Sequence, residues 1–373
     1  MAGELVLVEP LLVQDDRDLS AALAGLEPPI ALDTEFHSEH RYYPRLKLVQ
    51  LRDRAGRIVL IDPLAPLELG RLRALDGVDL LTHAPHQDLG ILGRVAGLVP
   101  GRVLDTQTLA GFAGLGYPRT LGDLVREVLG EAGASSRTLS DWSRRPLSEA
   151  QLTYAISDVS SLHHLAEVLL ERVGDRLEWA LEACSEQVDS ALSEPDVAEA
   201  WMRIGAADIL SPRGRSVLQR LAAWREATAR AQDQPHSQIA SNAVLVDLAR
   251  RRPSSLDEMT RNRRFPKRLA RRHSAVLLAH CASGRGDETY DHAARVELEA
   301  CERCLESWAL SFELQHGIAA RLALPPTLRR EVAEAVRART PIPLRGWRER
   351  ALSPELSRFV ADAKTFELLS IGK

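Results

Sequence analysis

Two carboxylates separated by one residue follow a short apolar stretch near the N-terminus. Asp33 and Glu35 flank Thr34 at the end of a segment that is typical of a strand. Strand side chains alternate, so the two acids point to one face, about 7 Å apart. Such a pair could bind a hard divalent cation through its oxygens. By itself, the pair is more typical of a solvated strand end.

Three further residues could complete such a site. Asp88 opens a predicted helix, a position where a carboxylate is also common simply as helix N-terminal charge. Tyr154 and Asp158 are four residues apart on a long predicted helix, one above the other. A tyrosine hydroxyl there can orient a metal-bound water, although an isolated pair is more often a half-buried Tyr beside a surface Asp. Asp105 is expected only to charge a helix N-terminus.

The order of these residues along the chain indicates phosphodiester chemistry. Four carboxylates can hold two Mg²⁺ or Mn²⁺ ions about 4 Å apart. One ion lowers the pKa of an attacking water, and the other stabilises the leaving 3′ oxygen. Mg²⁺ suits such a site because it prefers oxygen ligands and keeps waters for substrate phosphate.

The elements that must position these residues are typical of a mixed sheet covered by helices. Strands are expected at 29–33, 46–51, 58–61, 78–82 and 103–104, and helices at 87–95, 106–115 and 148–173. The second and third strands flank a polar turn and therefore predict an antiparallel hairpin.

One long helix is predicted to carry Tyr154 and Asp158. Ser148, followed by Glu149, is a typical N-cap for it. Six residues that recur at helical spacing, five of them apolar, predict its buried face. They are Leu152, Ile156, Val159, His163, Ala166 and Leu170.

The chain is expected to contain three domains. Residues 1–190 form an α/β domain, and residues 191–211 a linker. Two all-α units follow at 212–285 and 295–373, with proline and glycine breaks between their helices. At 373 residues the chain is long enough for this arrangement.

Composition excludes several classes of protein. The net charge is −4, and no apolar run approaches the roughly 20 residues that cross a bilayer. The N-terminus has no basic region of the kind that starts a secretory signal, so we expect a cytoplasmic location and no membrane partner. The four cysteines are too few for a disulfide framework, and the Cys301/Cys304 pair lacks the partners of a zinc site.

Charge is distributed unevenly along the chain. Residues 1–190 carry 18 basic and 29 acidic side chains, whereas residues 205–285 carry 16 basic and 6 acidic ones. Residues 286–373 are close to neutral. An acidic front joined to a basic middle is expected when one part holds cations and another holds polyanions.

Four motifs occur in order along the first domain. They are Leu32-Asp33-Thr34-Glu35-Phe36, then His83-Ala84-Pro85-His86-Gln87-Asp88-Leu89, then Asp141-Trp142-Ser143-Arg144-Arg145-Pro146-Leu147-Ser148, then Tyr154-Ala155-Ile156-Ser157-Asp158-Val159. With them the sequence resembles the ribonuclease D family, in the tyrosine branch of the DEDD 3′→5′ exonucleases. The tail resembles tandem HRDC domains, through residues 221–225 and 248–253 in the first copy and, more loosely, 344–348 in a degenerate second copy.

The resemblance implies a ribonuclease-H-like fold and stepwise release of 5′-nucleoside monophosphates from an RNA 3′ end. Asp33, Glu35, Asp88 and Asp158 would hold two Mg²⁺ or Mn²⁺ ions, and Tyr154 would position or help deprotonate the attacking water. The implied partners are tRNA precursors and other RNAs with 3′ tails. No obligate protein partner is implied.

A separate surface must attract RNA, because the acidic domain repels it. Ten basic side chains between residues 250 and 272 are candidates for phosphate contacts. They are Arg250, Arg251, Arg252, Arg261, Arg263, Arg264, Lys267, Arg268, Arg271 and Arg272. A solvated helical face is the alternative interpretation. Near the catalytic motifs, Phe36 could stack a terminal base or lie in the core, and Arg41, Arg144 and Arg145 could reach a phosphate.

Two other functions stay open from the residues alone. The same carboxylates serve DNA 3′→5′ exonucleases, and nothing in the sequence identifiably contacts a 2′-hydroxyl. A nucleic-acid-binding scaffold with an inert site is the other alternative, although the complete carboxylate set argues against it. A helicase is excluded, because the chain has no phosphate-binding GxxxxGK[ST] loop.

Overall fold

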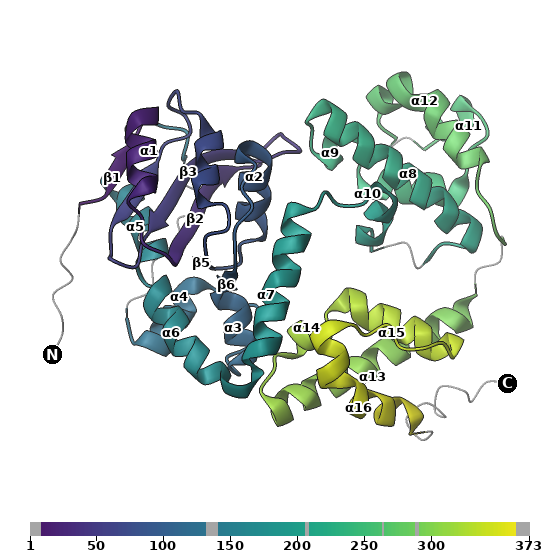
Figure 1. The fold of residues 1–373 in the computed structure, drawn as a ribbon. Helices are drawn as coiled ribbons and strands as arrows, with labels where there is room; N and C mark the ends of the chain where they lie inside the picture. The colour runs from purple at the N-terminus through teal and green to yellow at the C-terminus, as the bar shows by residue number, and fades with distance from the viewer. Residues whose placement is uncertain (1–8, 132–140, 206–208, 263–264, 288–290, 363–373) are drawn as a thin grey trace. The chain divides into compact units, whose positions relative to one another are not determined.

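The chain forms two compact units in the computed structural model, which describes residues 9–131, 141–205, 209–262, 265–287 and 291–362 (Figure 1). The first unit contains Met1–His37, Arg45–Ser193 and Leu298–Lys373, and the second contains Ser38–Pro44 and Glu194–Glu297. The short loop after the strand that carries Asp33 and Glu35 therefore belongs to the second unit.

A six-stranded mixed sheet forms the centre of the first unit, with strand order β1-β4-β3-β2-β5-β6. The strands are β1 (Leu11–Val13), β2 (Ile30–His37), β3 (Arg45–Arg52), β4 (Ile58–Ile61), β5 (Leu80–Thr82) and β6 (Val103–Asp105). Neighbours β2/β3 and β3/β4 are antiparallel, and the other pairs are parallel. The predicted hairpin at residues 46–61 is confirmed. The sequence patterns gave no sign of β1.

Both faces of the sheet are covered, as its alternating apolar residues require. The helices of this part are α1 (Asp16–Ala24), α2 (His86–Ala96), α3 (Thr106–Phe112), α4 (Leu121–Leu124), α5 (Glu149–Ser160), α6 (Leu162–Val173) and α7 (Leu177–Leu192). One face packs on α1 and α2 through residues such as Leu32 and Leu89. The opposite face packs on α5 and α6, for example through Leu48 against Ala155.

The predicted long helix is two helices. Helix α5 begins at the capping box of Ser148 and Gln151, which confirms the predicted N-cap, and it ends before Ser161. Helix α6 begins at Leu162. The buried face also differs from the prediction, since Leu152, Ile156, His163 and Leu170 are only half-buried. The side chains that are buried are Gln151, Ala155, Asp158, Val159, Leu162, Leu165, Ala166, Leu169 and Val173.

The C-terminal helices share a core with the first unit. They are α13 (His292–His316), α14 (Ala320–Ala323), α15 (Pro326–Ala338) and α16 (Gly346–Ala361). Buried Trp347 meets Phe112 of α3 edge-on, with ring centroids 4.9 Å apart. Cys301 is buried in the same core, and burial raises the pKa of its thiol to about 11. The HRDC resemblance of residues 295–373 stays a prediction.

The second unit is helical, with an apolar core of its own. Its helices are α8 (Pro212–Gln232), α9 (His236–Ile239), α10 (Asn242–Arg251), α11 (Leu256–Thr260) and α12 (Lys267–Ala282). Short irregular turns complete the chain: η1 (Leu69–Leu75), η2 (Val125–Leu129), η3 (Gly174–Arg176) and η4 (Val197–Arg203). Among the described residues, none of the helices combines the length and apolarity that a bilayer crossing needs.

Candidate active site

Three of the predicted acids meet where β2 passes under α5. Asp33 and Glu35 project from the same face of β2, and Asp158 projects from α5, which covers that face. One carboxylate oxygen from each lies within 4.8 Å of the others. The one-residue spacing on a strand and the packing of α5 on the sheet together produce this cluster.

Asp88 lies beside this cluster rather than within it. It is buried in the first turn of α2, where it accepts a short hydrogen bond from the Thr34 hydroxyl. The negative charge of Asp88 nevertheless raises the pKa of Asp33 and of Glu35, so Asp88 lies close to both. Thr34 points to the α2 face of the sheet because it alternates with the two acids. Sequence patterns gave Thr34 no role, although its place between the two acids could have suggested one.

Burial raises the pKa of all four acids of the site, and repulsion by neighbouring carboxylates adds to the effect at Asp33 and Glu35. The pKa of Asp33 is raised well above its usual value by burial first and then by the Asp88, Asp158 and Glu35 charges. Burial, with the Asp158 and Asp88 charges, raises the pKa of Glu35 to about 8. Burial also raises the pKa of Asp158 to about 7 and that of Asp88 to about 6. The fold therefore holds these carboxylates in an arrangement that disfavours their ionised forms.

Tyr154 shares a hydrogen bond with Asp158, one turn further along α5. Its ring lies 6.1 Å from that of buried Trp142, which limits where the hydroxyl can point. Burial, followed by the charges of Asp158, Glu35 and Asp33, raises the pKa of Tyr154 far above its usual value. Its hydroxyl therefore stays protonated and acts as a hydrogen-bond donor.

The donor set fits a divalent cation. Three carboxylates lie close enough to share one ion, and each offers a hard oxygen of the kind that Mg²⁺ and Mn²⁺ prefer. Their raised pKa values show that like charges meet there without compensation from protein cations. A bound cation would supply that compensation.

One further acid that was considered from the sequence, Asp105, has a structural role. Asp105 caps α3, accepting hydrogen bonds from the backbone N–H groups of Gln107 and Thr108. Its predicted role at a helix N-terminus is therefore confirmed.

Some of the residues near the acids that were predicted to contact RNA are engaged within the protein, and others are exposed. Phe36 packs against the apolar core of the sheet, half-buried. Arg145 forms a two-point salt bridge with buried Asp62, at 2.6 and 2.7 Å, and also donates to backbone carbonyls, which explains this residue without RNA. Arg144 is exposed. Arg41, in the second unit, pairs with Asp233 at 2.5 Å.

Most of the basic cluster is exposed. Lys267, Arg268, Arg271 and Arg272 lie on α12 with the one-face spacing of a helix, and Arg250 lies in the last turn of α10. Arg251 is exposed too, but pairs with Asp247 at 2.5 Å. Arg263 and Arg264 lie outside the described residues.

Comparison with known proteins identifies the class to which this fold and site belong. Residues 11–173 match the family model of 3′-5′ exonucleases, and residues 215–281 match that of the HRDC domain. The chain is therefore a 3′→5′ exonuclease with an HRDC domain behind it.

Whole-chain comparisons give the family. Ribonuclease D of Gluconacetobacter diazotrophicus is 34% identical over 74% of this chain and 72% of its own length. Ribonuclease D of Xanthomonas oryzae is 36% identical over 69% of this chain and 73% of its own. The crystal structure of Escherichia coli RNase D, an exoribonuclease, matches with a TM-score of 0.79 and 26% identity, over 95% of this chain and 99% of that one.

The chain belongs to the ribonuclease D family, and it is a 3′→5′ exoribonuclease. The resemblance, the fold class and the enzymatic activity predicted from the sequence are confirmed. Exonucleases of this family depend on divalent metal ions, in agreement with the acidic cluster.

The raised pKa values predict how the stability of the metal-free protein depends on pH. Carboxylates with ordinary pKa values near 4 in the unfolded chain bind protons up to about pH 6–8 in the folded one. The folded state binds more protons in this range, so the stability gained at low pH is lost as pH rises. We expect the melting temperature in EDTA to fall between pH 5 and 8, and Mg²⁺ to restore it at pH 8.

Asp33→Asn should remove part of this repulsion. At pH 8 in EDTA its melting temperature should rise by roughly 2–4 °C, the shift that about 1 kcal/mol produces in a domain of this size. Glu171→Gln, which alters an exposed acid on α6, is the matched control and should leave the melting temperature unchanged. A metal-free melting temperature that rises with pH in the wild type would contradict this electrostatic account.

Proposed function

We propose that the enzyme hydrolyses RNA from its 3′ end with two divalent ions, Mg²⁺ or Mn²⁺, held by Asp33, Glu35, Asp158 and Asp88. The observation that supports this most directly is the group of three carboxylates within 4.8 Å of one another. Asp33 has both other members and Asp88 acting on it, so it is the best candidate to contact both ions.

Bound ions would lower the pKa of the attacking water and offset charge that grows on the phosphate. The chain itself supplies orientation. Thr34 fixes one oxygen of Asp88, and Tyr154 holds Asp158 through its hydroxyl. Tyr154 would position the attacking water or help deprotonate it, and its hydrogen bond with Asp158 restrains its hydroxyl for either role.

The second unit provides the attraction that the acidic first unit lacks. The exposed cations of α12 and Arg250 form a basic surface on which phosphates can bind without regard to sequence. Arg251 stays a candidate member of this surface and Arg144 a candidate at the active site. Arg263 and Arg264, which lie outside the described residues, stay candidates for phosphate contact from the sequence alone. Arg41 and Arg145 are engaged within the protein, so their contribution would be to hold loops in place.

The proposed substrates are tRNA precursors and other structured RNAs with 3′ tails, processed in the cytoplasm without an obligate protein partner. The Escherichia coli relative is an exoribonuclease involved in structured RNA processing, which supports this choice. The nuclease residues themselves give no reason to prefer one RNA over another.

The reaction can be followed with a 5′-labelled oligoribonucleotide. We expect loss of one nucleotide at a time from the 3′ end with Mg²⁺ or Mn²⁺, and none in EDTA. Asp33→Asn and Glu35→Gln should each lower the rate by roughly 10³ or more, because an ion in such a site is worth several kcal/mol. Glu171→Gln should cut at the wild-type rate.

A deoxyribo-oligomer of the same sequence separates RNA from DNA preference. Internal cutting, or full activity of both active-site variants, would contradict the proposal.

Charge reversal tests the basic surface. Arg268→Glu and Arg271→Glu should each weaken RNA binding in EDTA and flatten its salt dependence, by about 0.7 in the log–log slope for each phosphate contact removed. Arg285→Glu reverses an exposed charge elsewhere in the same unit and serves as the control. Equal affinity of all variants at several salt concentrations would exclude this surface from RNA binding.

A further inference from the structure

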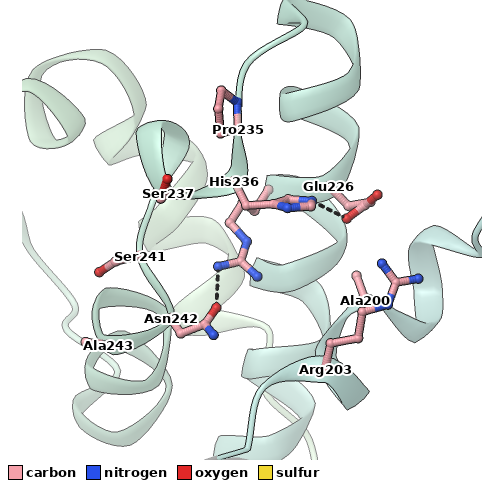
Figure 2. A pocket seen from close by; sticks show the side chains of 10 residues that line it. Ala200, Arg203, Glu226, Pro235, His236, Ser237, Ser241, Asn242 and Ala243 are labelled. Atoms are coloured by element: carbon pink, nitrogen blue, oxygen red, sulfur yellow. Dashed lines mark hydrogen bonds and ion pairs between the residues drawn. The ribbon is translucent and has the colours of Figure 1, made fainter. Parts of the chain in front are cut away.

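A pocket of about 610 Å³ opens in the second unit, between the start of α10, the middle of α8 and η4 (Figure 2). Its polar lining includes Arg203, Arg225, His236, Ser241 and Asn242. Figure 2 shows Arg203 on one side of the view and Ser241 and Asn242 on the other. None of these residues carries a function predicted from the sequence.

Arg225 is the unusual member of this lining. It is 6% exposed, which is rare for arginine. One terminal nitrogen donates to the Ala240 carbonyl and the Asn242 side chain, but the buried Nε has no partner. Burial lowers the pKa of Arg225, and its neighbour Glu226 only partly opposes this effect. A buried cation with incomplete pairing is costly unless an anion joins it.

The neighbouring charges leave the pocket cationic. Glu226 is already neutralised, because Tyr42, His236 and Arg230 all hydrogen-bond to its carboxylate. Arg203 is exposed, and no described residue pairs with its guanidinium. Two guanidiniums therefore face a space whose one carboxylate is engaged by three other side chains.

The start of α10 adds donors to the same space. Ser241 caps the N–H of Val244, whereas the N–H groups of Asn242 and Ala243 have no acceptor within the described part of the chain. These groups and the Arg225 guanidinium lie around one pocket, an arrangement that suits the oxygens of a phosphate.

We propose that this pocket binds a backbone phosphate of the RNA substrate through Arg203, Arg225 and the start of α10. The proposal rests on the RNA binding assigned to the second unit and adds a site outside its basic surface. The pocket shares Ser237 and Ser241 with a pocket lined by Arg268 and Arg272, and shares Asn242 and Ala243 with one lined by Arg250. Neighbouring pockets therefore share walls around the α9–α10 turn, which would let a phosphate chain run from one to the next.

The test compares RNA binding by full-length variants in EDTA, where no cutting occurs. Arg203→Ala should weaken binding of a labelled oligoribonucleotide roughly tenfold, as expected for a charge-assisted hydrogen bond, and should lower the salt slope by about 0.7. Arg225→Gln should do the same, and its melting curve shows whether it folds. Arg285→Ala is the control, beside Ser216 and roughly 14 Å along α8 from Arg225.

A second measurement locates the effect. RNA should slow amide hydrogen exchange in peptides that cover residues 237–246 of the wild type, and not in Arg203→Ala. Inorganic phosphate alone should give a weaker form of the same protection.

Wild-type affinity and slope in Arg203→Ala would overturn the proposal, whether or not Arg225→Gln folds. If Arg268→Glu weakens binding in the same assay, the proposed function stands and only the pocket is rejected. If no variant and no salt concentration affects RNA binding, the proposed RNA surface fails as well.

Gln50 carries an independent inference. Its side chain is fully buried on β3, and neither its amide nitrogen nor its amide oxygen has a hydrogen-bond partner. Most buried polar groups are satisfied, and an orphaned one requires an explanation. On the adjacent strand β2, its register partner is Asp33. Residues directly opposite in an antiparallel pair share a face, so Gln50 lies beside the catalytic carboxylate under α5.

The rest of that neighbourhood is apolar. Leu48 and Leu60, the latter opposite Gln50 on β4, belong to the cluster under α5 with Trp142 and Ala155. We propose Gln50 as a positioning residue: its amide, unpartnered in this structure, would donate a hydrogen bond to the Asp33 carboxylate once that group is ionised and turned toward a bound ion. An apolar residue would fill the same space without that function.

The variant Gln50→Leu distinguishes a positioning role from one of merely filling space in the core. Removal of an orphaned buried amide should raise the melting temperature in EDTA. The same variant should bind Mn²⁺ several-fold more weakly by electron paramagnetic resonance, and its kcat should fall while KM is unchanged. Gln315→Leu makes the same exchange at an exposed position on α13 and should change none of these.

Wild-type Mn²⁺ affinity and kcat in Gln50→Leu would overturn the assignment. The failure would leave the proposed function intact, because Asp33→Asn tests that separately.

Discussion

Repulsion among like charges is the constraint on which this structure depends. Asp33, Glu35 and Asp158 are held together although the charges of Glu35 and Asp158 raise the pKa of Asp33, and that of Asp158 raises the pKa of Glu35; Asp88 adds to both effects. Only a rigid framework can maintain such an arrangement without metal. Here the central strand β2, the packing of α5 over it and the hydrogen bond between Thr34 and Asp88 provide it. A bound cation would relieve this repulsion, and the relief would add to the affinity of the site for the cation.

The same constraint explains the division between the two units. A domain built to attract cations repels RNA, so the attraction for a polyanion must come from elsewhere in the chain. The second unit has its own core and exposes basic side chains on α12. By contrast, the C-terminal helices share the core of the first unit through contacts such as Trp347 with Phe112. Their near-neutral composition suits packing more than RNA binding.

Sequence patterns were most informative where a local rule determines the structure. Alternation on a strand placed Asp33 and Glu35 on one face, and helical spacing paired Tyr154 with Asp158. Interactions between distant segments left no such pattern. The break at Ser161, the salt bridge of Arg145 with Asp62 and the burial of Gln50 beside Asp33 depend on tertiary packing. The alternation of side chains along β2 also could not predict that Asp88 would accept a hydrogen bond from Thr34, on the face of the sheet opposite Asp33 and Glu35.

The most direct test of the central claim is the position of Mn²⁺ in a crystal of the full chain, located by its anomalous scattering. The account predicts strong anomalous peaks within coordination distance of Asp33, Glu35 and Asp158, and their loss in Asp33→Asn. A well-ordered crystal at high Mn²⁺ with no peak among these carboxylates would contradict it.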